Sequence, residues 1–400
     1  MGKLRFFTTG ESHGKGLVGL LEGLPAGVPV KQELIDTELR RRQGGYGRGG
    51  RMKIEQDHAE LISGVRWGKT LGSPVAVLIE NRDHKNWLEG MSSDAVHAGS
   101  IPAVTRPRPG HADLAGALKY DHADVRNILE RSSARETATR VALGAIAKQF
   151  LAEFGIVIGS YVTQIGRAKM PAPDTCCPEK SLFELADASA VRCPDEKTTK
   201  KMIRQIDEAV KKGDTVGGVF EVIALNLPIG LGSHVQWDAK LDARLAYAVM
   251  SIQAIKGVEL GMGFGVAERF GSEVMDEIFF DKKRAPKTKN MPCCPPYYRE
   301  TNRAGGVEGG MTNGMPVVVR AAMKPIPTLR KALRSVDLGT KKPFEAAYER
   351  SDTCAVPAAS VVGEAMVALV LADAMIEKFG GDSLKETKHN YESYLAQIYT

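Results

Sequence analysis

The sequence has few cysteines, and it lacks the motifs of several common enzyme classes. Its six cysteines, at positions 176, 177, 193, 293, 294 and 354, include no CxxC pair. This spacing argues against a tetrahedral metal site and favours free thiols in a reducing cytoplasm. Neither the HExxH motif of zinc proteases nor the GxxxxGK[ST] phosphate loop occurs. We therefore expect no metal site and neither of these two hydrolytic chemistries.

A secretory leader and a membrane span are not indicated either. The first residues, MGKLRFFTTGESHG, contain no apolar signal core. The longest apolar stretch, Ser360 to Phe379, carries Glu364, Asp373 and Glu377. Such a stretch predicts a buried helix and not a transmembrane one. We expect a cytoplasmic protein without a membrane partner.

Positive charge is modest in total but unevenly distributed. The net charge is +6, yet the tract from Arg40 to Lys53, RRRQGGYGRGGRMK, holds five arginines and one lysine and no acidic residue. Such a tract could bind nucleic acid. Arginines on a glycine-rich loop can equally bind a small phosphorylated or carboxylated ligand through paired hydrogen bonds. Because the tract is single and is accompanied by one tyrosine, we expect no nucleic-acid partner.

Strand-like and helix-like segments alternate along the chain without a regular βαβ repeat. This arrangement predicts an α+β sandwich of sheets and helices in a single large domain over residues 1–400. Loop insertions are expected near residues 171–178 and 281–302, which are rich in proline, lysine and cysteine. The predicted strands are 17–21, 74–80, 219–227 and 316–321, and the predicted helices are 136–154, 198–212 and 360–379.

Three glycine-rich segments stand out. GESHG, from Gly10 to Gly14, matches the GxSxG pattern of serine esterases around Ser12, but a strand is expected to follow it where that pattern requires a helix. GMGFG, residues 261–265, does not fit a dinucleotide fingerprint, because its third glycine comes one position early and no clear strand precedes it. NRAGGVEGGMTNG, residues 302–314, could let the backbone approach a flat or anionic ligand closely.

Several stiffened loops carry cationic side chains. RPRPGHAD, residues 106–113, places two arginines and a histidine between prolines and a glycine. RSSARETATR, residues 131–140, is typical of a helix N-terminus, and KPIPTLRK (324–331) and ERSDTCAVPA (349–358) again combine proline with charge. Converging guanidinium groups suit a substrate with several negative groups, while two imidazoles and a carboxylate suit stepwise proton transfer.

Taken together, these blocks resemble the chorismate synthase family. The resemblance rests on TTGESHG, RRRQGGYGRGGRM, RPGHAD, RSSARETA, QAIKGVE, NRAGGVEGGMTNG, KPIPTL and ERSDTCAVPA, which span Thr8 to Ala358. It implies a lyase of the shikimate pathway to aromatic amino acids, which converts 5-enolpyruvylshikimate 3-phosphate to chorismate and phosphate by anti-1,4-elimination. It also implies a requirement for reduced FMN, a β-α-β sandwich and a homotetramer.

The resemblance also implies roles for individual residues. His13 is the expected acid for the departing phosphate, His111 the residue that hydrogen-bonds and protonates the reduced flavin, and Asp352 the carboxylate that removes the ring proton together with the flavin. Arg42 and Arg48 match positions that contact substrate phosphate or NADP, and Arg108 and Arg135 are expected to complete the anion pocket. The expected flavin contacts are Arg131, Ser132, Ser133, Gln253, Ala254, Gly309, Lys324, Pro325, Ile326, Pro327, Thr328 and Arg350.

Two features are not explained by the resemblance. The cysteine pairs at 176–177 and 293–294 match no motif of the family, and we assign them no function. Some relatives reduce their own flavin with NAD(P)H. Because no dinucleotide fingerprint is visible, we expect an external flavin reductant here.

Overall fold

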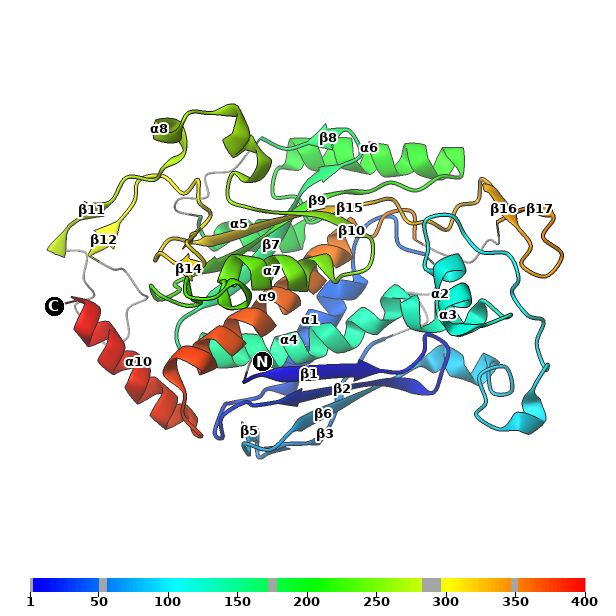
Figure 1. Cartoon of the computed structure of the whole chain (residues 1–400), viewed down its shortest axis with the longest axis horizontal. Coiled ribbons are helices and arrows are strands. Elements are labelled where there is room, and N and C mark those ends of the chain that lie inside the picture. Colours follow the sequence, from blue (N-terminus) through cyan, green and yellow to red (C-terminus); the bar gives the residue numbers. More distant parts are fainter. Residues whose placement is uncertain (1–2, 50–55, 172–177, 283–295, 347–351, 400) are drawn as a thin grey trace.

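Two antiparallel sheets enclose a layer of helices, as a computed structural model shows (Figure 1). The structure describes residues 3–49, 56–171, 178–282, 296–346 and 352–399. The first sheet has the strand order β1 (Arg5–Thr9), β2 (Gly16–Glu22), β6 (Val75–Glu80) and β3 (Glu60–Ser63). The second has the order β10 (Ile255–Leu260), β15 (Val317–Met323), β9 (Gly218–Leu225), β7 (Val157–Ile165) and β8 (Ala168–Lys169).

The burial pattern of each sheet matches its place in the fold. In β2 and β6 buried residues alternate with more exposed ones, because one face packs on helix α4 (Thr137–Ala152) and the other lies nearer solvent. In β7 and β9 long runs are buried on both faces. Helix α9 (Val356–Phe379) covers one face of this second sheet, while α5 (Ser181–Ala188) and α6 (Glu196–Lys212) also pack on β7.

Helices α4 and α9 form the middle layer between the sheets (Figure 1). Both are buried almost all round, as expected for helices enclosed by other elements. Their backbones approach closely at Gly144, where a β-carbon would lie 2.4 Å from that of Ala365. Helix α9 is long and apolar enough to cross a membrane, but 89% of its apolar window is buried inside the protein. The prediction of a core helix here is confirmed.

The β-α-β sandwich that the family resemblance implied is thus the observed architecture. All four predicted strands and all three predicted helices are present, with ends that differ by a few residues. One detail was wrong: a strand, β10, does directly precede the GMGFG segment. Gly261 follows it, but a short 3-10 helix at Gly263–Glu268 comes next and the strand belongs to an antiparallel sheet, so the context still differs from a βαβ unit.

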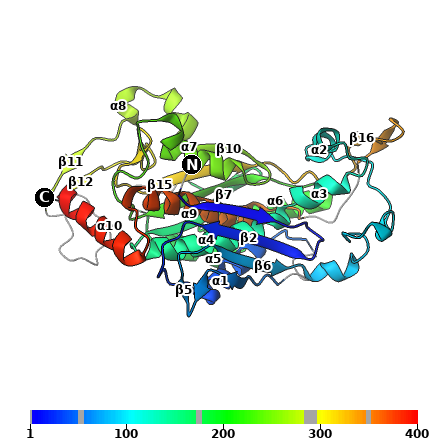
Figure 2. The ribbon, with the colours of Figure 1, turned by 60° about the horizontal axis from the view of Figure 1, so that its bottom comes forward.

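Further elements complete the chain. The remaining helices are α1 (Gln32–Gln43), α2 (Asp113–Tyr120), α3 (Arg126–Ser132), α7 (Leu241–Met250), α8 (Gly271–Val274) and α10 (Leu384–Tyr399). The short strands are β4 (Val65–Arg66), β5 (Lys69–Thr70), β11 (Phe279–Phe280), β12 (Tyr297–Tyr298), β13 (Val307–Glu308), β14 (Met311–Thr312), β16 (Arg334–Val336) and β17 (Pro343–Glu345). Helices α2 and α3 lie at the opposite end of the molecule from α8 and α10 (Figures 1 and 2).

The two predicted loop insertions lie partly outside the described residues. Of the first, residues 172–177 are not described, and of the second, residues 283–295 are not described. Both cysteine pairs fall in these gaps. The described part of the second insertion contains β12, which pairs with β11.

One continuous hydrophobic core extends from Leu4 to Tyr391 and includes residues of both sheets.

Candidate active site

His13 lies between two carboxylates in the turn that joins β1 to β2. Its Nδ1 is 2.7 Å from Oε1 of Glu130, and its Nε2 is 4.0 Å from Oδ2 of Asp83. The imidazole also packs against Trp87, with a distance of 4.4 Å between ring centroids. Both ring nitrogens of His13 thus face a carboxylate, so the ring can hold a proton on one nitrogen and exchange a proton at the other. The surroundings of His13 therefore suit an acid.

Ser12 does not have the setting of an esterase nucleophile. Its hydroxyl is buried and donates to Oγ of Ser133 at 3.1 Å. Residues Gly10–Gly14 connect two antiparallel strands, whereas the nucleophile elbow connects a strand to a helix. The serine-esterase alternative thus loses its structural basis, and the contact instead brings the predicted flavin-binding residue Ser133 next to His13.

Three of the predicted arginines converge around two aspartates. Arg42 and Arg135 both contact Asp57, at 3.2 and 2.5 Å, and Arg48 donates to Oδ2 of Asp352 at 2.6 Å. Burial lowers the pKa of Arg42 to about 10, and the positive charges of Arg135 and Arg48 add to this effect. Three guanidinium groups thus share two carboxylates. This excess of positive charge would be relieved by an anionic ligand.

A hydrogen-bond chain connects this arginine cluster to His13. Nε of Arg135 donates to Oδ1 of Asn81 at 2.9 Å. The Asn81 amide in turn donates to the carbonyl oxygens of Glu11 and Gly14, which flank His13, at 3.0 and 2.9 Å. The predicted acid, His13, and the predicted anion pocket are therefore connected through Asn81.

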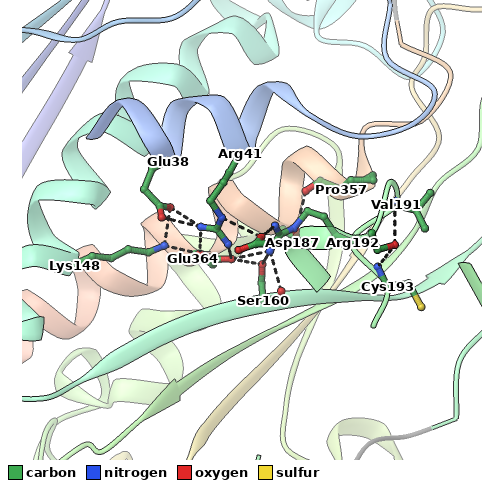
Figure 3. A network of polar contacts seen from close by, with 12 residues as sticks. Glu38, Arg41, Lys148, Ser160, Asp187, Val191, Arg192, Cys193, Pro357 and Glu364 are labelled. Atoms are coloured by element: carbon green, nitrogen blue, oxygen red, sulfur yellow. Dashed lines mark hydrogen bonds and ion pairs between the residues drawn. The ribbon is translucent and has the colours of Figure 1, made fainter. Parts of the chain in front are cut away.

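In the described part of the arginine tract, Arg40 is exposed and donates to the Thr37 hydroxyl, while the other three arginines pair with carboxylates. Arg42 is buried, and Arg48 pairs with Asp352. Arg41 points into the core, where it bonds to Glu364 together with Lys148 and Arg192 (Figure 3). These guanidinium groups are bound to carboxylates, whereas nucleic-acid binding requires them at the surface for phosphate contacts. Arg51 and Lys53 lie outside the described residues.

His111 belongs to a second cluster, built around Asp113. Asp113 accepts bonds from His111, from Nε of Arg108 at 2.8 Å and from the Arg108 amide at 3.0 Å. Although burial opposes ionisation, the hydrogen bonds from His111 and Arg108 keep the pKa of the Asp113 carboxyl well below its usual value. The proline-rich loop is held from outside by Ser335, whose hydroxyl donates to the Pro107 carbonyl.

The segment Lys324–Thr328 lies along this histidine loop. Nη1 of Arg108 donates to the Thr328 hydroxyl at 3.1 Å, and the Lys324 ammonium group contacts the Gly110 carbonyl. The Lys324 amide donates to the carbonyl of Ala254 at 2.9 Å. Two predicted flavin-binding stretches, Gln253–Ala254 and Lys324–Thr328, are thereby connected to the loop that carries His111.

A third set of contacts links Arg131 to Gln253 through Thr8 and Glu136. Arg131 donates to the Thr8 carbonyl at 2.6 Å, and the hydroxyl of Thr8 donates to Glu136 at 2.7 Å. Glu136 also accepts the Gln253 amide at 3.0 Å. The Oε1 atom of Gln253 is buried and has no partner in the described protein. It is an acceptor that a ligand N–H group could use.

Helices α2 and α3 join the two histidine clusters. Asp113 begins α2, Glu130 lies in α3, and the helices pack together through Ala117, Val125 and Leu129. No contact recorded for the described residues joins His13 to His111 directly. The pair of helices fixes the position of each imidazole relative to the other.

Some predicted residues are not brought into these clusters. Gly309 and Gly310 form the turn of the β13–β14 hairpin, and both have positive φ angles, so the hairpin alone explains glycine there. The hydroxyl of Ser132 donates back to the Ile128 carbonyl, and the Ile326 carbonyl accepts from Thr215. Pro325 lies between Lys324 and Ile326 in the same segment, and its ring carries no hydrogen-bonding group. Arg350 lies outside the described residues.

Sequence reasoning missed the acidic partners of the site. Asp57, Asp83 and Glu130 hold the predicted arginines and His13, yet no motif marked them. They come from three separate stretches that meet only in the folded chain. Asp113 could have been found, because it follows His111 by two residues in the same rigid loop.

Comparison with known proteins gives one consistent result. The family model described as Chorismate synthase matches residues 4–376. Curated proteins named chorismate synthase are similar to this chain. That of Geobacter sulfurreducens is 59% identical over 395 residues, which cover 99% of both chains. That of Aquifex aeolicus is 56% identical over 401 residues, which cover 99% of this chain and 98% of the relative. The chain belongs to the chorismate synthase family.

A solved structure of the family agrees with this membership. The crystal structure titled Crystal Structure of Chorismate Synthase is similar to this fold with a TM-score of 0.78 at 47% identity, and covers 99% of this chain and 98% of its own. Because the family match extends along nearly the whole chain, the protein is an enzyme of this family, a lyase. The resemblance noted from the sequence motifs is confirmed.

Proposed function

We propose that the protein converts 5-enolpyruvylshikimate 3-phosphate to chorismate and phosphate by anti-1,4-elimination, with reduced FMN as cofactor. The observation that carries this proposal is the linkage of His13, held between Glu130 and Asp83, to a cluster of three arginines that share two carboxylates. The substrate bears a phosphate and two carboxylates. Such a ligand needs several fixed cations to offset the loss of its hydration.

In this proposal the arginines bind and His13 supplies a proton. Arg42, Arg48 and Arg135 compensate the charge of the bound anion, which favours departure of phosphate. His13 donates a proton to the departing phosphate. Asp352 accepts the ring proton. Its carboxylate is oriented by Arg48 and by the backbone amide of Gly49, each at 2.6 Å.

The residues around His111 fit a flavin. The buried acceptor of Gln253 suits the imide N–H of an isoalloxazine ring. Lys324–Thr328, Ala254 and the loop that carries Arg108 supply backbone and cationic groups next to His111. When bound, reduced FMN supplies electron density transiently to the allylic system as the C–O bond breaks. His111 hydrogen-bonds the flavin and controls its protonation.

Phosphate release tests the proposed reaction. We expect the protein to release phosphate from 5-enolpyruvylshikimate 3-phosphate under anaerobic conditions with reduced FMN, and not with oxidised FMN. With oxidised FMN and NADPH we expect turnover only after a separate flavin reductase is added, since an external reductant is proposed. Turnover without any flavin would contradict the cofactor proposal, and turnover with NADPH and FMN alone would contradict the external reductant.

We further propose a homotetramer in the cytoplasm. Buried free thiols at Cys193 and Cys354 support a reducing compartment. Assembly is supported by what we term the apolar edge, a group of large exposed side chains around the 3-10 helix, α8 and β11. It consists of Phe264, Phe270, Met275, Ile278 and Phe280, beside a cavity of about 500 Å³ lined mainly by apolar residues such as Leu260 and Val274.

Light scattering tests the assembly. Four chains of 43.2 kDa each are expected in the native particle. The double substitution Phe264→Asp and Phe270→Asp should dissociate it, because charges at a buried interface core are unfavourable. Trp67→Ser, which changes an equally exposed aromatic residue on the β4–β5 hairpin, is the control. A wild-type particle of another size would refute the tetramer. A double variant that stays tetrameric would show that the apolar edge is not an interface.

A further inference from the structure

Glu130 contacts His13 twice, and the mechanism proposed above leaves it unused. Its Oε1 lies 2.7 Å from Nδ1 of the imidazole, and its Oε2 accepts the backbone amide of His13 at 2.8 Å. The Glu130 carbonyl also accepts the amide of Ser12 at 3.0 Å. The side chain is only 3% exposed. A buried carboxylate therefore holds both the ring and the backbone of the predicted acid.

The other charged groups around His13 do not compete with Glu130 for the Nδ1 atom. From α3, the Arg126 guanidinium lies 3.9 Å from Glu130 and over the ring of Trp87, 5.0 Å from its centroid. From the 3-10 helix at Arg82–Asn86, Asp83 faces Nε2 at 4.0 Å, and the ring of His84 contacts the His13 carbonyl at 3.0 Å. Glu130 alone is at hydrogen-bond distance from Nδ1 among the recorded contacts.

We propose that Glu130 is a positioning residue that keeps a proton on Nδ1 of His13 and thereby directs Nε2 toward the substrate. The inference rests on the proposed role of His13 as the acid. A carboxylate accepts but does not donate, so it fixes the ring orientation and the site of protonation. When both ring nitrogens carry a proton, the Nδ1 proton stays hydrogen-bonded to Glu130, and the proton on Nε2 is the one that can be given up.

Glutamine at position 130 would reverse this arrangement. The backbone amide of His13 requires an acceptor, so the single oxygen of the glutamine amide would remain there. Its NH2 group would then face Nδ1 and donate to it. Nδ1 would have to give up its proton, and the ring could not become an imidazolium without placing two donors against each other. Glu130→Gln thus makes protonation of Nδ1 unfavourable with almost no change in volume.

The test compares Glu130→Gln with Glu130→Asp and with Glu208→Gln, an exposed control whose partner is Lys212. Titration of His13 is followed in the resting enzyme by NMR with labelled histidine, assigned with a His13→Gln variant. Turnover is measured against pH. In Glu130→Gln we expect His13 to titrate at lower pH and kcat near neutral pH to fall by about 100-fold, with little change in KM. Glu130→Asp should keep the charge and part of the activity.

The outcomes separate the positioning role from the proposed function. If His13 titrates in Glu130→Gln as it does in the wild type, the positioning role is overturned. If the titration shifts but turnover does not, Glu130 anchors His13 as inferred and the acid role of His13 is overturned. If Glu130→Gln loses its fold, the same titration in Glu130→Asp decides, because a shorter carboxylate must weaken the Nδ1 contact and move the titration.

Discussion

Replacement of His111 by alanine is expected to lower turnover by about two to four orders of magnitude while leaving the fold intact. The imidazole is the predicted partner that hydrogen-bonds and protonates the reduced flavin. Its loss should not disturb the loop, because Arg108 keeps its bonds to Asp113 and Thr328. Turnover is measured by anaerobic phosphate release and folding by thermal unfolding.

The matched control is His58→Ala. The His58 side chain is 61% exposed and contacts only Asp36 among the recorded partners. The two variants make the same chemical change, one in the candidate site and one at the surface. If His111→Ala turns over at the wild-type rate, the assignment of His111 is wrong. If its midpoint of unfolding falls strongly as well, His111 supports the loop, and the loss of activity alone would not identify a catalytic role.

Replacement of Glu364 by alanine is expected to destabilise the protein by about 3–5 kcal/mol, the usual cost of leaving a buried charge unpaired. Glu364 is fully buried in α9 and bonds to Arg41, Lys148, Arg192 and Ser160 (Figure 3). The alanine variant would leave three cations near one another in the core without this partner. Urea denaturation monitored by circular dichroism gives the free energy of unfolding.

The Glu364 carboxyl group also predicts that the free energy of unfolding depends on pH. Although burial disfavours the charged carboxylate, Arg41 and Lys148 hold the pKa of Glu364 well below its usual value. A lowered folded-state pKa contributes stability above the unfolded-state pKa, about 4.3, which is lost progressively as the pH falls below it. The wild-type free energy of unfolding should therefore drop below about pH 4 more steeply than that of Glu364→Gln.

The exposed pair Glu208–Lys212 provides the control for both Glu364 measurements. Glu208→Gln should leave the free energy of unfolding nearly unchanged, since solvent screens exposed pairs. If Glu364→Ala is equally mild, Glu364 contributes little to stability, and Glu38 and Asp187, which already contact the three cations (Figure 3), compensate for its loss.

The elements predicted from the sequence were those with a strong local signal. The amphipathic α6 and the long apolar α9 have clear patterns of burial, and β9 and β15 are rich in β-branched residues. Helices α1, α7 and α10 and strand β7 are among the elements that were not predicted. Strand β7 is covered on both faces, so its sequence lacks the alternation that marks a strand with one exposed face.

The candidate site was predictable only in part. The motifs identified the histidines and arginines, since these residues stand out in stiff, glycine-rich or proline-rich loops. They did not identify the acids that orient these residues. Glu130 resembles any acidic residue of a short helix, and Asp57 lies in a stretch without a motif. Their importance depends on burial next to a cation or an imidazole, which is a property of the folded chain.

The sequence by itself determined the family, the sandwich of sheets and helices, and the cationic character of the site, because motifs and hydrophobic patterns are local. Only the tertiary structure decided which charges meet. Arg41 and Arg42 are neighbours in the sequence, yet one bonds to Glu364 in the core and the other to Asp57 beside the predicted anion pocket. Successive helical side chains point about 100° apart, so adjacent arginines on α1 face different surroundings, and only the packing of α1 assigns a partner to each.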